Sequence, residues 1–187
     1  ITADSLYQNM KVPFGYNYID RSNTYLGHDQ DMEGEHGSHV AGIATSNAYV
    51  PNGDGTFSTA LNSVLVQGVA PDAQLFVMKV FGQNGGAYDS DYMAAIEDAI
   101  VLGADSVNLS LGSTLPGFTR SEAYQEVMDR LTQSDTVVVI SAGNAGHWVD
   151  NGFHGMKGYL YAEDVDMFTG GSPGAYANAL TVASVDL

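Results

Sequence analysis

The sequence has 187 residues and a formal net charge of −16, the balance of 6 basic and 22 acidic side chains. This length suits one domain that buries roughly 70% of the surface of its unfolded chain. An acidic surface repels phosphate groups, so the composition argues against binding to nucleic acids or to anionic membranes. No apolar run approaches the roughly 18 residues of a membrane span. Because cysteine is absent, disulfides, thiolate zinc sites and cysteine nucleophiles are excluded.

The first part of the chain contains few regular segments. The first 35 residues predict irregular structure around one short strand, Gly15–Ile19. A short helix is predicted at His39–Ala48, where apolar residues recur with helical spacing. The turn residues of Pro51–Gly55 then predict a loop from Tyr49 to Ser63.

From residue 75 onwards, strands and helices alternate. The predicted strands are Leu75–Phe81, Ser106–Leu111, Thr136–Ser141 and Ala179–Val185. The predicted helices are Ser90–Leu102, which Gly103 ends, and Ser121–Thr132. The first strand is a nearly continuous apolar run, which indicates burial on both faces.

This alternation predicts an α/β fold with a parallel sheet and right-handed crossovers. In such sheets the functional site lies beyond the carboxyl ends of the strands. The chemistry is therefore expected in the loops that begin at Gly82, Gly112 and Ala142.

The octapeptide His36–Ile43 carries the strongest local signal. A histidine at the start of a short helix suits a general base for a serine nucleophile, because its pKa lies near neutral pH. Two other interpretations stay open. The histidines could be ordinary surface residues. They could also bind a metal, since His36 and His39 lie three residues apart near four acidic residues between Asp29 and Glu35, although four-residue spacing suits zinc better.

Two further segments follow predicted strands. In Ser141–Gly146, small residues flank Asn144, whose amide could project into a cleft as an oxyanion hole requires. A simple Gly-Asn turn is the alternative. The strand that ends in Ser110-Leu111-Gly112 could pair with an extended peptide by strand addition.

Together these segments resemble the subtilases, the subtilisin-like serine proteases, in both order and context. The matching motifs are the histidine motif His36–Ile43 (with Ser38 where the family usually has Thr), the turn Gly68–Pro71, the strand Leu75–Val80, the segment Asn108–Gly112, the oxyanion segment Ser141–Gly146 and the later strand Thr181–Val185. The resemblance implies a subtilisin-like doubly wound sheet, mainly parallel, with helices on both faces and incomplete in this chain.

A narrower resemblance concerns the lactocepin-type cell-envelope proteinases and the streptococcal complement-cleaving peptidases. The segments Tyr7–Tyr18, Val69–Leu75 and Gly171–Gly174 are similar to theirs. This implies a secreted or cell-wall-attached protein. It also implies a protease-associated domain inserted just after Leu187.

The family's Asp-bearing strand and its Gly-Thr-Ser-Met-Ala motif are not found. Asp4 lacks the apolar run of the family's Asp strand, and no predicted helix follows Ser172. We therefore expect residues 1–187 to be the central part of one subtilase catalytic domain. On this view the chain is inactive alone, and its partners are the remaining segments of the same protease, which carry the catalytic Asp and Ser.

Carried over residue by residue, the resemblance implies that His36 is the general base and that Asn144 stabilises the oxyanion. The expected substrate-binding residues are Gly85, Gly86 and Ala87 for one wall of a peptide groove, Ser110, Leu111 and Gly112 for the other, and Ser141, Ala142 and Gly143 for the floor. The expected substrate is a polypeptide. No cofactor is required; structural calcium is common in the family, but no residue is assigned to it. The alternative function is a non-catalytic subtilase-like scaffold or binding module.

Overall fold

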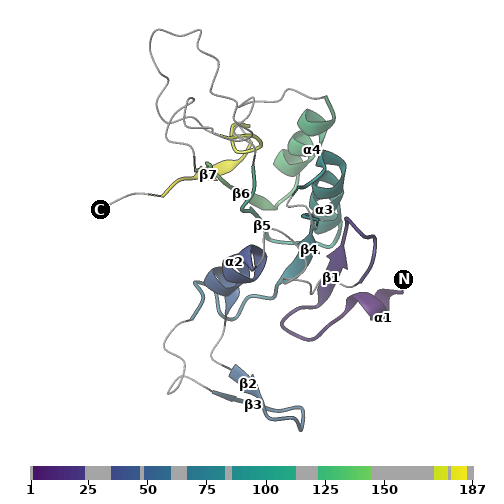
Figure 1. Ribbon diagram of the computed structural model, residues 1–187, viewed down its shortest axis with the longest axis vertical. Helices are drawn as coiled ribbons and strands as arrows, with labels where there is room; N and C mark the ends of the chain where they lie inside the picture. The colour runs from purple at the N-terminus through teal and green to yellow at the C-terminus, as the bar shows by residue number, and fades with distance from the viewer. Residues whose placement is uncertain are drawn as a thin grey trace. The chain divides into compact units, whose positions relative to one another are not determined.

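The computed structural model describes residues 2–23, 35–46, 49–59, 67–82, 86–112, 122–144, 171–176 and 178–184. The chain divides into two compact units, a first unit of residues 1–95 and a second unit of residues 96–187. Figure 1 labels the elements in chain order. Among the described residues, no helix is both long and apolar enough to cross a membrane.

The first unit begins with α1 (Ala3–Leu6) and contains a sheet of two parallel strands. β1 (Phe14–Asn17) pairs with β4 (Phe76–Lys79), at the positions where the sequence predicts strands (Figure 1). The four residues of β4 are only half-buried, so the predicted burial on both faces is wrong. A sheet of two strands offers other elements little area to cover. β4 therefore stays partly exposed to solvent.

α2 spans His36–Thr45 and so begins earlier than the predicted His39–Ala48. The predicted start depends on apolar residues at helical spacing, whereas the first three residues of the helix are exposed and polar or small. The hydrogen bond from the His39 N–H to the carbonyl oxygen of Glu35, 2.9 Å long, closes this first turn. The helix ends at Thr45, with Ser46 as its C-cap, so it also ends earlier than predicted; Ala48 itself lies outside the described residues.

A hairpin follows α2. β2 (Tyr49–Pro51) and β3 (Phe57–Thr59) pair in antiparallel fashion around a turn. The Asn52 N–H donates to the carbonyl oxygen of Thr56 across this turn, at 2.9 Å. The predicted loop Tyr49–Ser63 is therefore wrong at both strands, although its turn is confirmed. Strands of three residues are too short for an alternating pattern to be recognised.

The second unit contains a sheet of three parallel strands in the order β5-β6-β7. These are β5 (Ser106–Leu109), β6 (Val137–Ser141) and β7 (Leu180–Val182). The central strand β6 buries Val138 and Ile140. The three predicted strands are confirmed. β5 and β6 are one or two residues shorter than expected, whereas β7 has three residues instead of the seven predicted for Ala179–Val185.

α3 (Asp89–Val101) confirms the predicted helix and its predicted end. Gly103 has a φ of 74°, a conformation that glycine adopts without steric cost. Its N–H donates to the carbonyl oxygen of Ile100 at 3.0 Å, and the Ala104 N–H donates to that of Ala99 at 2.9 Å. This paired arrangement is a Schellman motif, which satisfies two carbonyl groups at the helix end.

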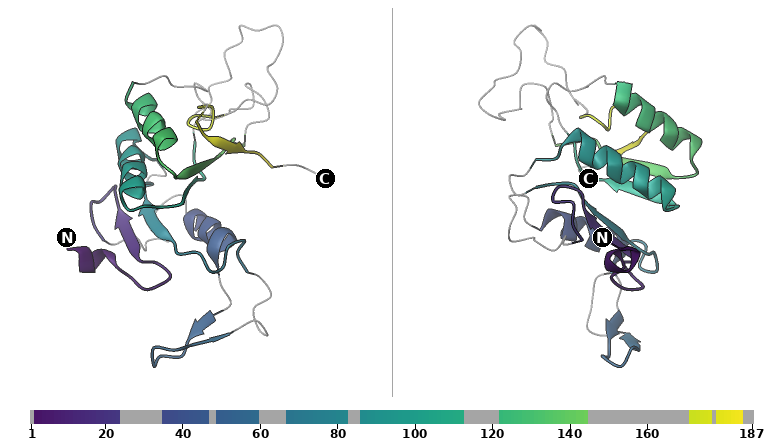
Figure 2. Two further views of the ribbon diagram at one scale, coloured as in Figure 1. Left: turned by 180° about the vertical axis from the view of Figure 1, so that it is seen from behind. Right: turned by 90° about the vertical axis from the view of Figure 1, so that its right-hand side faces the viewer.

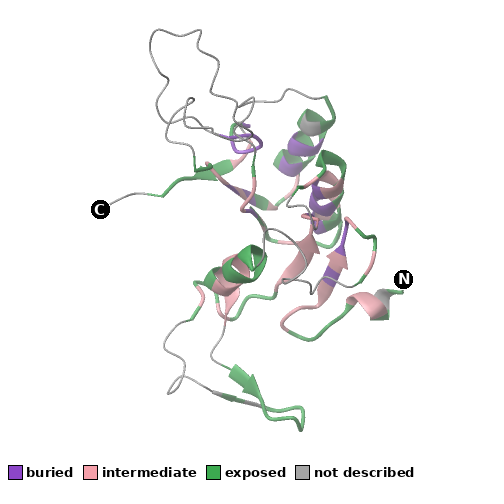
Figure 3. Ribbon diagram, viewed as in Figure 1, coloured by how far each residue is buried: buried purple, intermediate pink, exposed green. Residues whose placement is uncertain are grey.

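α4 (Glu122–Gln133) also confirms a predicted helix. Val127, Met128 and Leu131 are buried and share one stripe of the helix, as the spacing of an amphipathic helix requires. Figure 3 shows the buried positions of α4 together with those of α3 and the strands. Burial of such side chains contributes about 1.5–3 kcal/mol each and is the main source of stability in this unit.

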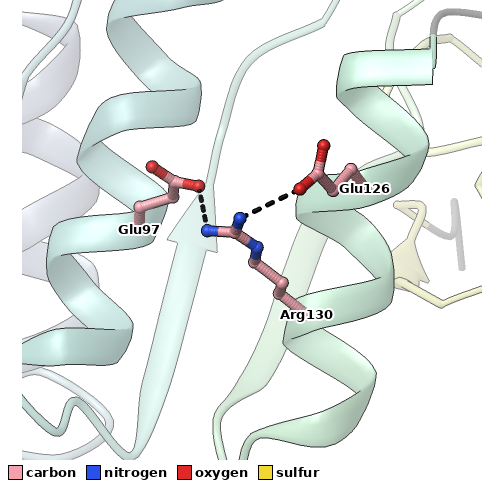
Figure 4. Close-up of polar contacts among 3 residues, drawn as sticks. All are labelled: Glu97, Glu126 and Arg130. Atoms are coloured by element: carbon pink, nitrogen blue, oxygen red, sulfur yellow. Dashed lines mark hydrogen bonds and ion pairs between the residues drawn. The ribbon is translucent and has the colours of Figure 1, made fainter.

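On the surface, Arg130 of α4 binds two carboxylates. Its guanidinium lies 2.7 Å from Glu97 of α3 and 2.9 Å from Glu126 of α4 (Figure 4). The two helices lie side by side at this point (Figure 2). All three side chains are exposed, so each ion pair contributes at most about 1 kcal/mol. The helices and the parallel strand pairs confirm the predicted α/β class.

Candidate active site

His36 is the first residue of α2, and its side chain is exposed. His39 lies one turn further along and is exposed as well. The acidic residues 29, 31 and 33, which the metal interpretation needs, fall outside the described residues. In the part of the chain that is described, no group of three His, Asp or Glu side chains could hold a metal ion. The position of His36 suits a base that must reach an external substrate.

The carboxyl end of α2 is capped by the turn that follows β3 in the chain, Gly68–Pro71. The N–H groups of Gly68, Val69 and Ala70 donate to the carbonyl oxygens of residues 46, 43 and 44 respectively, each at 2.9 Å. The last carbonyl groups of a helix have no partner within the helix. The turn supplies these partners, and so fixes the end of the helix that begins with His36.

Gly68 lies too close to α2 for any side chain. A Cβ atom at this position would lie 2.5 Å from the Ser46 nitrogen and 2.7 Å from the Thr45 nitrogen. Both are backbone atoms that could move only if the helix end moved. The glycine of this motif is therefore explained by its contact with the histidine helix.

In the second unit, two predicted site segments lie side by side at the carboxyl ends of neighbouring strands. The register pairs Leu109 of β5 with Ile140 of β6, so that Ser110 and Ser141 follow at the same edge of the sheet. The Ser141 hydroxyl donates to the carbonyl oxygen of Leu111 at 3.3 Å. The structure thus brings together the expected groove wall (Ser110–Gly112) and the expected floor (Ser141–Gly143).

Asn144 lies three residues beyond the last residue of β6, directly after Gly143. Gly143 has a φ of 95°, which a residue with a side chain rarely adopts. Asn144 is exposed. An exposed amide just beyond the end of a strand can donate a hydrogen bond to a group outside the sheet, as an oxyanion donor must.

The turn Gly171–Tyr176 contacts both of these segments, and sequence reasoning did not place it at the site. The Gly171 N–H donates to the carbonyl oxygen of Ala142 at 3.1 Å. A Cβ atom on Gly174 would lie 2.9 Å from the Ser141 carbonyl oxygen, and one on Gly112 would lie 3.1 Å from that of Ser172. The turn therefore packs against both the expected floor and the expected wall of the groove.

The signal for this turn is its own sequence, Gly-Ser-Pro-Gly, which by itself indicates only a resemblance to the lactocepin-type proteinases. Ser172 within it is 8% exposed. A nucleophile must reach its substrate, so this burial supports the expectation that Ser172 is not the catalytic serine.

The other expected wall, Gly85–Ala87, belongs to the first unit. Gly85 lies outside the described residues. Gly86 is exposed, and its carbonyl oxygen accepts a hydrogen bond from the Gly82 N–H at 3.0 Å. Ala87 is half-buried. His36 belongs to the first unit as well, and Asn144 to the second.

Known proteins resemble this chain along nearly its whole length. The PI-type proteinase of Lactococcus lactis subsp. cremoris is 38% identical over 183 residues, which cover 96% of the chain and 9% of that protein. The C5a peptidase of Streptococcus pyogenes serotype M18 is 33% identical over 178 residues, which cover 94% of the chain and 14% of that protein. The chain thus spans a small part of these relatives, and the predicted similarity to lactococcal and streptococcal proteinases is confirmed.

The fold has a solved counterpart in sphericase. That structure is 27% identical, with a TM-score of 0.52, and the match covers 78% of this chain and 38% of that one. It confirms the predicted subtilisin-like fold class. The profile of the Subtilase family matches residues 3–187. The chain belongs to the Subtilase family.

Proposed function

We propose that this chain is part of a serine endopeptidase of the subtilisin type, which hydrolyses peptide bonds of extended polypeptides. The observation that carries the proposal is the contact between residues 110–112 and 141–143 at the carboxyl ends of β5 and β6. Family membership supports it, because the residues that match the family, 3–187, include both segments. The full catalytic set is proposed to include an Asp and a Ser from segments outside residues 1–187.

In this proposal His36 is the general base. It takes the proton of the serine hydroxyl as the serine oxygen attacks the scissile carbonyl carbon, and it later gives that proton to the leaving amine. The catalytic Asp orients the imidazole and stabilises its charged form. The exposed position of His36 at the start of α2 is compatible with this role.

Asn144 is proposed to donate a hydrogen bond to the oxyanion of the tetrahedral intermediate. Ser110–Gly112 is proposed to pair with the extended substrate on one side and Gly85–Ala87 on the other. Ser141–Gly143 would form the floor beneath the residue that precedes the scissile bond. Pairing through backbone groups gives affinity that depends little on the substrate sequence.

The chemistry moves protons and electron pairs between side chains and substrate, so we propose that it needs no cofactor. Calcium in a structural role is left unassigned. By similarity to the lactococcal and streptococcal proteinases, the protein is proposed to be secreted or attached to the cell wall.

A fluorophosphonate probe, which reacts with activated serines, tests the proposal. The full-length protein should be labelled on a serine outside residues 1–187 and should hydrolyse a protein substrate. The same probe should label nothing in a preparation of residues 1–187 alone. Absence of both labelling and hydrolysis in the full-length protein would favour the scaffold alternative, and labelling within residues 1–187 would refute the proposed division of the catalytic groups.

A further inference from the structure

Lys11 lies far from α2 in sequence but contacts the turn that caps this helix. Its ammonium donates to the carbonyl oxygen of Pro71 at 2.6 Å and to that of Ala73 at 2.5 Å. Hydrogen bonds from a charged donor are roughly twice as strong as those between neutral groups. With a single side chain, Lys11 therefore joins one carbonyl group of the turn Gly68–Pro71 and one just after it.

The backbone around Lys11 is held in place from both sides. The Asn9 side-chain oxygen accepts hydrogen bonds from the N–H groups of Lys11 (2.9 Å) and Val12 (2.8 Å). The Leu75 N–H donates to the Lys11 carbonyl oxygen at 2.8 Å, and the Gln74 side chain donates to that of Met10 at 2.8 Å. These hydrogen bonds fix the backbone that carries the Lys11 side chain, so few conformations of the side chain are needed to reach the turn.

Burial lowers the pKa of Lys11, and the charge of Asp72 opposes this shift. The Lys11 side chain is half-buried, and its ammonium makes both hydrogen bonds at the protein surface. Two contacts from one ammonium, at 2.6 and 2.5 Å, restrict the side chain more than a single surface pairing would.

The turn is hydrogen-bonded to α2 as well as to Lys11. Its N–H groups at residues 68–70 bond to the end of α2, and the Ala73 N–H closes the turn on the Ala70 carbonyl oxygen at 3.1 Å. A continuous set of hydrogen bonds therefore joins Lys11 to the helix whose first residue is His36. The intrahelical hydrogen bonds of α2 connect its capped end with its first turn, which begins at His36.

We infer that Lys11 is a positioning residue: through the turn Gly68–Pro71 it fixes α2 and so holds His36 in the orientation that the proposed reaction needs. The inference about catalysis rests on the proposed function, whereas the mechanical link between Lys11 and α2 does not. Catalysis is sensitive to displacements of about 1 Å, which can cost on the order of 100-fold in rate.

The test compares three variants of the full-length protein. Lys11→Met removes the donors and keeps the apolar stem. Lys11→Arg keeps the charge and the donors. Arg130→Met is the matched control, because it replaces a long cation of the exposed Glu97 and Glu126 pairs with the same residue.

Hydrogen exchange measured by mass spectrometry reports the link directly. Amides of the last turn of α2 should exchange at least about tenfold faster in Lys11→Met, since a hydrogen bond to a charged group is lost. Lys11→Arg should restore part of the protection, and Arg130→Met should leave it unchanged. Unchanged exchange of α2 in Lys11→Met would overturn the inference.

Kinetics report the consequence for His36. In Lys11→Met, kcat per titrated active site should fall about tenfold or more while KM changes little. If exchange of α2 increases but kcat per active site stays at the wild-type value, Lys11 has only a structural role and the positioning inference is wrong. If the wild-type protein shows no turnover at all, the proposed function fails, and the exchange of α2 still decides whether Lys11 fixes this helix.

Discussion

The Ser141 hydroxyl donates a hydrogen bond to the carbonyl oxygen of Leu111, 3.3 Å away and 30 residues earlier in the chain. This hydrogen bond joins the carboxyl ends of β6 and β5, which are neighbouring strands of the sheet. The two segments that the sequence assigns to the floor and one wall of a peptide groove are therefore neighbours in space. This adjacency is the geometric basis of the proposed substrate site.

Gly68→Ala should destabilise the protein by about 1–3 kcal/mol, the usual cost of overpacking. The added Cβ would lie within 2.7 Å of two backbone nitrogens of the α2 end and would force the cap apart. Gly42→Ala is the matched control, because a Cβ there meets no atom within 4 Å. It should leave stability unchanged or raise it by about 0.5–1 kcal/mol through its better helix propensity. Urea unfolding of both variants measures the difference, and equal stability of the two would contradict the account of Gly68.

The titration of Asp54, in the turn of the hairpin, is expected to depend on the hydroxyl group of Thr56. The pKa of this carboxyl group is lowered from its ordinary value, mainly by the hydrogen bond from the Thr56 hydroxyl, 2.5 Å long. A lowered pKa in the folded state stabilises the hairpin above the ordinary pKa, and this stabilisation is lost as pH falls through the folded value. Thr56→Val should raise the pKa of Asp54 toward its ordinary value, and Thr56→Ser should not. An NMR titration of labelled Asp tests this; identical titration of both variants would show that the hydroxyl is not the cause.

Asn144→Ala should lower kcat of the full-length protein and leave KM nearly unchanged, because an oxyanion exists only in the transition state and the intermediate. The expected loss is about 10²–10³ in kcat, a magnitude taken from an oxyanion-hole asparagine of subtilisin, a member of the same family. The melting temperature should change little, since the side chain is exposed. If kcat per titrated active site stays near the wild-type value while stability falls, Asn144 only shapes a turn.

The elements that the sequence predicts well are those with strong local signals. Gly103 indicates the end of α3 because only glycine readily adopts its φ of 74°. Ser121 followed by the acidic Glu122 predicts the start of α4, because such residues are typical of the first turn of a helix. The early start of α2 at His36 is missed for the converse reason: its first turn contains no apolar residue, so the pattern has nothing to detect.

The candidate site depends on contacts between distant residues, which local patterns do not encode. The roles of Gly68 and Gly174 become visible only when the backbone atoms that crowd them are placed in space. The contacts of Lys11 with Pro71 and Ala73 cross about sixty residues and follow from tertiary structure alone. Motif order can assign the residues of such a site to a family, but only the fold shows which segments touch.

The comparison of His36→Ala with His39→Ala in the full-length protein tests the central claim most directly. Both residues are exposed on α2, one turn apart, so the two substitutions are matched in structural cost. The measurement is kcat/KM on a peptide substrate, together with the melting temperature of each folded variant. The account predicts that His36→Ala abolishes turnover without unfolding the protein, whereas His39→Ala keeps the chemical step and at most affects stability. Turnover that survives in His36→Ala, or a larger loss in His39→Ala, would contradict the assignment of His36 as the general base.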